Sequence, residues 1–117
     1  MINVPEKFPE LVEALVAALE KADEVDLSCQ VREAVARRVT FDSSANAAYL
    51  YLADPNRTSN VAERKGIDQR IEKTVQVETP FCTILDVDNF DRLVGIEILD
   101  PGTLRRGLRE EADACDE

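Results

Sequence analysis

The sequence predicts an α+β fold: a small antiparallel β-sheet of hairpins with about four or five strands, an N-terminal amphipathic helix and a short C-terminal helix. Three observations lead to this class. Apolar residues near the N-terminus recur at helical spacing. Further along, apolar and polar residues alternate in several short runs that turn-forming residues separate. The last segment opens with a proline and carries a weaker helical stripe.

Residues 5–22 are expected to form the first helix, with Phe8, Leu11, Val12, Leu15, Val16 and Leu19 on its apolar face. Pro5 and Pro9 lie in or before its first turn, where proline is tolerated. Most such stripes pack on the protein's own core, and docking on a partner is the alternative. Residues 28–37 are ambiguous between helix and strand, and Ser28 is a candidate helix cap.

The first predicted hairpin surrounds the turn "DSSAN", which begins at Asp42. Val39 and Phe41 alternate with polar residues before the turn. After it, Tyr49 and Tyr51 lie on one face of the returning strand, and an alanine and two leucines lie on the other.

Three further strands are expected in the second half of the chain. Segment 54–70 is polar and reads as a long connection. "KTVQVET" alternates, with Val75 and Val77 inward, and "FCTILDVD" and "RLVGIEIL" follow. Cys82 lies in an apolar run and is expected to be buried.

Composition excludes several classes of function. The chain has no histidine, so histidine-based catalytic triads and histidine-ligated zinc are ruled out, and its four glycines form no phosphate-binding loop. No enzyme motif and no cofactor are therefore expected. The net charge of −10 opposes direct nucleic-acid binding and suits a basic protein partner. The three dispersed cysteines, and the lack of a leader or a membrane-spanning run, favour the cytoplasm.

The acidic stretch "ILDVDNFDRLVGIEILD", residues 84–100, resembles a metal-binding loop at first sight. An EF-hand starting at Asp86 does not fit, because its fifth and ninth positions would be Phe90 and Val94. A looser Ca²⁺ or Mg²⁺ site remains open. The other interpretation is that Asp86 and Asp88 only precede a hairpin turn.

Glu97 is the carboxylate that this turn does not explain. Alternation places it with Leu93 and Gly95, where it would need a partner such as Arg38 or a tyrosine hydroxyl. Gly95 could admit a ligand or an aromatic neighbour across the sheet. The candidate ligand or interaction positions are Asp42, Tyr49, Asp86, Asp88, Gly95 and Glu97.

The segments "FDSSANAAYLYL" and "LDVDNFDRLVGIEILD", separated by "TVQV", resemble domain-of-unknown-function family 2283, a family of small, mostly bacterial proteins. Its members typically read Tyr-Asp, a polar turn and Leu-Tyr-Ile, then an Asp-x-Asp turn that runs into Leu-Val-Gly-Ile-Glu-Ile-Leu. The resemblance covers about residues 38–104. Phe41 stands where tyrosine is usual, Asn46 where an acid is common, and Asp91 where glycine often closes the turn.

The resemblance implies a small antiparallel-sheet domain without an established activity, and an antitoxin-like or accessory role beside small toxin-like proteins. We expect a single domain: a helical extension over 1–37, a β-rich core over 38–104, and a C-terminal helix with an acidic tail over 105–117. The function favoured is a non-enzymatic interaction module, a homodimer with a basic protein partner. The alternative is a small-ligand or divalent-metal-binding protein that uses Asp86, Asp88 and Glu97.

Overall fold

The computed structural model describes residues 1–53 and 71–115, and the predicted connection 54–70 lies outside the described residues. The helical elements are α1 (Val4–Lys7), α2 (Pro9–Lys21), α3 (Val25–Arg32), the short 3₁₀ helix η1 (Gly102–Leu104) and α5 (Arg105–Cys115). The strands are β1 (Ile2–Asn3), β2 (Val35–Asp42), β3 (Ala47–Ala53), β4 (Ile71–Val77), β5 (Thr83–Asp88) and β6 (Leu93–Ile98).

The strands form one antiparallel sheet in the order β1-β2-β3-β6-β5-β4. The predicted α+β class is confirmed, with six strands in place of four or five. The additional strand, β1, has only two residues, too few to show alternation, and it lies in the segment expected to be helical. The β2–β3 and β5–β6 hairpins meet where β3 pairs with β6, so two segments far apart in the sequence lie side by side.

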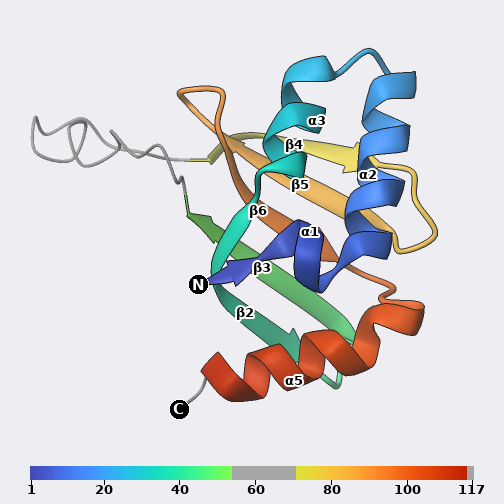
Figure 1. The fold of residues 1–117 in the computed structure, drawn as a ribbon, viewed down its shortest axis with the longest axis vertical. Coiled ribbons are helices and arrows are strands. Elements are labelled where there is room, and N and C mark those ends of the chain that lie inside the picture. The colour runs from blue at the N-terminus through green and yellow to red at the C-terminus, as the bar shows by residue number, and fades with distance from the viewer. Residues whose placement is uncertain (54–70, 116–117) are drawn as a thin grey trace, which may run out of the picture.

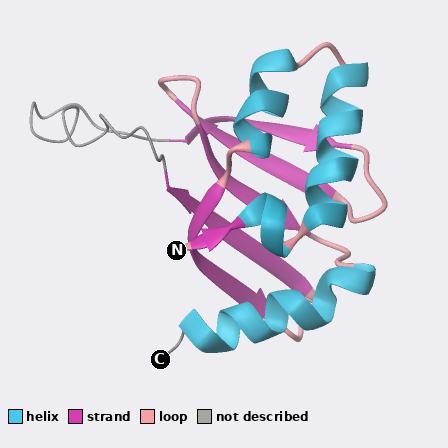
Figure 2. Ribbon diagram, in the orientation of Figure 1, coloured by secondary structure: helices cyan, strands magenta, loops and turns pink. Residues whose placement is uncertain are grey.

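The helices lie over one face of the sheet (Figures 1 and 2). The core between these layers includes fully buried residues from both, among them Leu11, Leu15, Leu50, Ile96 and Leu108. Burying such aliphatic side chains supplies the main driving force for folding, roughly 2 kcal/mol for each one. Among the described residues, no helix covers the opposite face, which we call the open face.

The predicted helix 5–22 is two helices, because the chain leaves helical geometry at Phe8, where φ is −127° and ψ is 63°. Pro9 disfavours a helical conformation in the residue before it and then occupies the first position of α2. Helix α1 starts with a cap that sequence reasoning missed, since Asn3 Oδ1 accepts a hydrogen bond from the Glu6 amide at 3.1 Å.

Residues 28–37 contain both the end of a helix and the start of a strand. Ser28 lies inside α3 and is not its cap, because its hydroxyl donates to the Val25 carbonyl at 3.0 Å. Gln30 connects α3 to the β5–β6 hairpin: its Oε1 accepts from the Leu93 amide at 2.7 Å, and its Nε2 donates to the Asp91 carbonyl at 3.2 Å. One helical side chain thus fixes the position of this hairpin.

Two side-chain placements predicted from the sequence were wrong, the burial of Cys82 and the face on which Leu93 lies. Cys82 is exposed in the turn before β5, where its φ is 49°. Leu93 faces the core and not the side of Glu97, because the β5–β6 register shifts between Asp86 and Val87. The shift leaves Val94 without an opposite residue, which is a β-bulge. Alternation is regular only beyond this bulge.

Candidate functional site

Two rows of side chains cross the open face from strand to strand. Directly opposite residues in antiparallel strands point to the same face, so the registers of the four strand pairs define both rows. The first row, which we call the arginine row, consists of Arg38, Tyr51, Gly95, Asp86 and Thr74. The second, the glutamate row, consists of Thr40, Tyr49, Glu97, Ile84 and Gln76.

Tyr49 connects the two rows. The backbone of Tyr49 lies opposite that of Glu97 on β6, but the ring of Tyr49 lies across Gly95, and its hydroxyl donates a hydrogen bond to Asp86 Oδ2 at 2.6 Å. A Cβ on Gly95 would lie 1.8 Å from the Tyr49 hydroxyl oxygen and 2.3 Å from Cζ. Only glycine leaves room for this crossing. Of the two predicted reasons for a glycine here, the aromatic neighbour across the sheet is confirmed.

The second tyrosine lies next to the first and beneath an arginine. The ring centroids of Tyr49 and Tyr51 are 4.6 Å apart with an interplanar angle of 59°. The Arg38 guanidinium carbon lies 5.8 Å from the centroid of Tyr51, within the range of a cation–π interaction. The open face therefore combines two partly exposed aromatic rings, a guanidinium and two carboxylates, Asp86 and Glu97.

The pKa of the Tyr49 hydroxyl is raised well above its ordinary value of about 10. Burial is the largest cause, because it disfavours the phenolate. The second cause is the hydrogen bond to Asp86, since it requires the proton to stay on the tyrosine. The negative charges of Asp86 and Glu97 also raise the pKa of Tyr49. At neutral pH Tyr49 is therefore a hydrogen-bond donor and not a base.

The pH dependence of this site can be followed optically, because Tyr49 and Tyr51 are the chain's two tyrosines and no tryptophan is present. We expect an alkaline absorbance titration to show a tyrosine step displaced to higher pH, absent in Tyr49→Phe and moved to lower pH in Asp86→Asn. The folded-state pKa exceeds the unfolded one, so the stabilisation is complete below pH ~10 and declines as the pH rises from there. A wild-type profile identical to that of Asp86→Asn would contradict the assignment.

Two of the six candidate positions belong to turns and not to the open face. Asp42 Oδ1 accepts hydrogen bonds from the Ser44 amide and hydroxyl and from the Ala45 amide, and these bonds hold the pKa of its carboxyl below the ordinary value. The Asp88 side chain is fully buried and caps the turn before β6. Both carboxylates therefore shape hairpins.

Both carboxylate oxygens of Asp88 have partners in its turn, whereas the hydrogen bonds of Asp42 use Oδ1. Its Oδ1 accepts from the amides of Phe90 and Arg92, each at 2.8 Å, and its Oδ2 forms an ion pair with Arg92 Nε at 3.0 Å. Asp91 in the same turn has a φ of 60°, which is the left-handed region. Glycine adopts such angles without strain, and aspartate tolerates them better than most other residues.

The arrangement gives no support to a metal site made of Asp86, Asp88 and Glu97. Among residues 1–53 and 71–115, no group of three or more acidic or cysteine side chains could hold a metal ion. Asp86 accepts from Tyr49, and Asp88 is directed into its turn. The Tyr49 hydroxyl does not pair with Glu97, one of the partners expected for it.

The structure brings four of the six predicted positions together: Tyr49, Asp86, Gly95 and Glu97. It adds Arg38 and Tyr51 as members of the same surface. The alternation that placed both tyrosines on one face was the available signal for Tyr51. The register that aligns Arg38 with it follows from pairing between strands, which a single sequence does not show.

In a comparison with protein families, residues 38–100 match the model described as protein of unknown function (DUF2283). The matched residues begin within β2, end just after β6 and include every member of the two rows. No curated protein and no solved structure matches the chain.

Proposed function

The chain belongs to the DUF2283 family of proteins of unknown function, and we propose that it is a small non-enzymatic interaction module that binds a basic protein through its open face. The observation that carries this proposal is the pair of rows. Partly exposed tyrosine rings beside carboxylates, on a sheet face without a covering helix among the described residues, suit arginine and lysine side chains.

Arg38 indicates how a partner's cation would be held. Its guanidinium lies over Tyr51, so this ring already accepts a cation from the chain itself. Asp86 and Glu97 are further along the same two rows and add negative charge beside the rings. The chain's net charge of −10 would accelerate the approach of a basic protein and favour it over an acidic one.

The non-enzymatic part of the proposal rests on the chemistry of the chain. The sequence has no histidine, and nothing in the described residues or in the family match indicates a catalytic activity. The buried carboxylates already have structural partners, Tyr49 for Asp86 and the turn amides for Asp88. A carboxylate held in this way is a poor general base.

The proposed place of action is the cytoplasm. Its support is the dispersed set of three cysteines, of which Cys29 and Cys82 are free thiols. No helix in the described part of the chain has the length and apolar character needed to cross a membrane. An antitoxin-like or accessory role toward a small cationic protein is one specific version of the proposal, and the acidity of the chain is what favours it.

The proposal is tested by titrating the protein with a nona-arginine peptide while recording tyrosine fluorescence, which reports on the open face alone. We expect saturable binding that weakens as salt is added. Glu97→Gln should weaken the affinity for the peptide by about two- to fivefold, which corresponds to the loss of about 0.4–1 kcal/mol from an exposed ion pair. Tyr51→Ala should also weaken it, because the stacking surface is lost.

Glu13→Gln is the matched control, since it removes the same charge from an exposed position of α2, which lies on the other side of the sheet. It should leave the affinity for the peptide within error of the wild type. Equal weakening by Glu13→Gln and Glu97→Gln would mean that the peptide responds only to net charge, and the open face would then not be the binding site.

A further inference from the structure

Strand β4 forms one end of the sheet, and its outer backbone edge pairs with no other strand among the described residues. The strand is long for an edge, Ile71–Val77, and residues 71–74 are exposed. Edge strands of this kind are usually covered, charged or paired, because their free amides and carbonyls can join another strand. The opposite end is different, since the edge strand β1 has only two residues.

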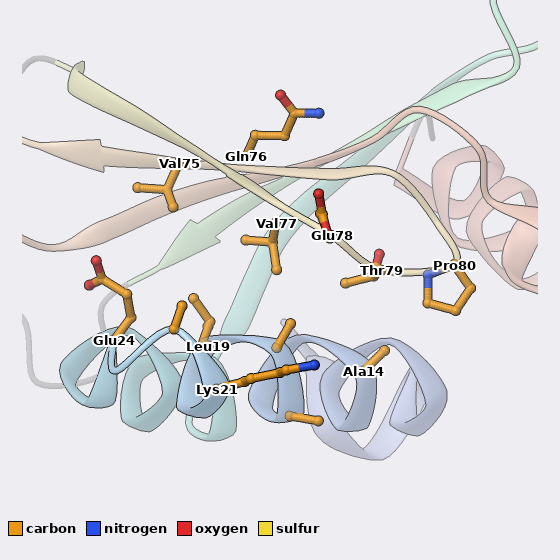
Figure 3. A pocket seen from close by; sticks show the side chains of 13 residues that line it. Ala14, Leu19, Lys21, Glu24, Val75, Gln76, Val77, Glu78, Thr79 and Pro80 are labelled. Carbon is orange, nitrogen blue, oxygen red and sulfur yellow. The ribbon is translucent and has the colours of Figure 1, made fainter.

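A groove of about 770 Å³ runs between this edge and helix α2. Figure 3 shows Val75 and Val77 directed toward α2, and Gln76 directed away from it. The facing wall consists of small and apolar side chains of α2, the charged Lys21 at the helix end, and two residues that follow the helix: Ala14, Ala17, Ala18, Leu19, Lys21, Ala22 and Glu24. A strand added beside β4 would therefore find backbone partners at the edge and an apolar surface under its helix-facing side chains.

The regular part of β4 is complementary to a second copy of itself. Lys73–Val77 pairs with β5 without interruption, and the register shifts only before Lys73. A two-fold axis through Val75, perpendicular to the sheet, would place Val75 opposite Val75 of the other copy and Thr74 opposite Gln76. Both pairs are compatible, and the one like-charged pair that this register brings together, Glu72 opposite Glu78, lies just outside the segment at two exposed positions.

Charge identifies the occupant as a second copy. The edge and the groove carry two lysines and three glutamates, Lys21, Lys73, Glu24, Glu72 and Glu78, so this surface is nearly neutral on a chain with a net charge of −10. Two equally acidic copies can approach closely only at such a surface, whereas a basic partner is attracted more strongly to acidic ones.

We propose that two copies of this chain associate by antiparallel pairing of their β4 strands about Val75, with the helix-facing side chains of each strand seated in the α2 groove of the other copy. The result is a continuous sheet across the dimer. This association uses only the β4 members of the two rows, Thr74 and Gln76, so the tyrosines and carboxylates of each open face stay available for a partner.

The association is tested by light scattering and sedimentation equilibrium on the full chain between about 1 and 100 µM. We expect a dimer in the upper part of this range. Ala17→Glu should be monomeric throughout, because it places a charge in each groove, and Ala17 is exposed, so the fold should remain. Ala114→Glu is the matched control: it adds the same charge at an exposed position of α5 and should dimerise like the wild type.

Cross-linking tests the register in a background where Cys29, Cys82 and Cys115 are serine. In the Val75→Cys variant, the two introduced cysteines of the dimer should form a disulfide with each other under mild oxidation. The Thr74→Cys variant should not form one, since residue 74 of one copy lies opposite Gln76 of the other. A wild-type monomer at 100 µM would overturn the proposal and leave the edge to a strand of another protein. A dimer that persists in Ala17→Glu, or Thr74→Cys cross-linking more readily than Val75→Cys, would overturn it as well.

The two proposals fail separately. Loss of nona-arginine binding with the dimer intact would reject only the open-face function. A monomer that still binds the peptide with the expected dependence on Glu97 would reject only the β4 association.

Discussion

Gly95→Ala is expected to lower the free energy of unfolding by about 2–3 kcal/mol and to break the hydrogen bond between Tyr49 and Asp86. The new Cβ would stand 1.8 Å from the Tyr49 hydroxyl oxygen, so the ring must leave its position across β6. Asp86, which is only 9% exposed, would then lose its donor in a nearly water-free place. Urea denaturation followed by circular dichroism measures the loss, and an unchanged m-value shows that stability alone has changed.

A double-mutant cycle with Tyr49→Ala isolates the cause. If the clash with the ring dominates, Gly95→Ala should cost much less in the Tyr49→Ala background than in the wild type, giving a coupling energy of about 1–2 kcal/mol. Gly107→Ala in α5 is the control for replacing a glycine by alanine. The new Cβ would lie 3.3 Å from Phe8 Cε1, and alanine favours the helix. Equal costs of Gly95→Ala in both backgrounds would show that the tyrosine is not what requires glycine.

The requirement for Gly95 illustrates what a single sequence reveals about this site. Alternation placed Tyr49 and Tyr51 on one face and put Gly95 and Glu97 together, and both placements are confirmed. Nothing in the pattern indicated that Tyr49 would reach past its opposite residue, Glu97, to Asp86 on the next strand. That contact depends on the pairing of β3 with β6, strands more than 40 residues apart in the chain.

The wrong predictions share a physical origin, because in each case a local feature interrupts a regular pattern. Pro9 breaks a helical stripe that is otherwise continuous, and the bulge at Val94 turns Leu93 to the opposite face. Cys82 looked like part of a strand because its neighbours are apolar, but the turn that reverses the chain includes it. Periodicity describes regular elements and is least informative where they end.

Asp88→Ala is the second substitution with a large expected effect, a loss of about 2–4 kcal/mol in the free energy of unfolding. Although the acidic stretch around Asp88 suggested metal binding, the Asp88 carboxylate organises the β5–β6 turn through two amides and the Arg92 guanidinium. Alanine would remove the acceptor of the two amides and the buried carboxylate that Arg92 Nε contacts. Thermal and urea unfolding would both report the loss.

Asp42→Ala is the matched control, because Asp42 caps the other hairpin with the same Oδ1-to-amide geometry but is exposed. Water can replace an exposed acceptor, so Asp42→Ala should be clearly less destabilising than Asp88→Ala. Asp88→Asn separates the two roles of the buried carboxylate, since it keeps an acceptor for the amides and loses the charge opposite Arg92. Its stability should lie between those of the wild type and Asp88→Ala.

The β5–β6 turn also holds the open face in place, which links this stability to the proposed function. Asp86 and Gly95 are adjacent to the β-bulge beside this turn. Gln30 of α3 binds the same hairpin from the helix-covered face of the sheet. In Asp88→Ala, nona-arginine binding should therefore weaken even under conditions where the protein remains folded, because Tyr49 and Asp86 lose their fixed separation. If Asp88→Ala unfolded no more readily than Asp42→Ala and bound the peptide normally, the turn would contribute neither stability nor position, contrary to its buried hydrogen bonds.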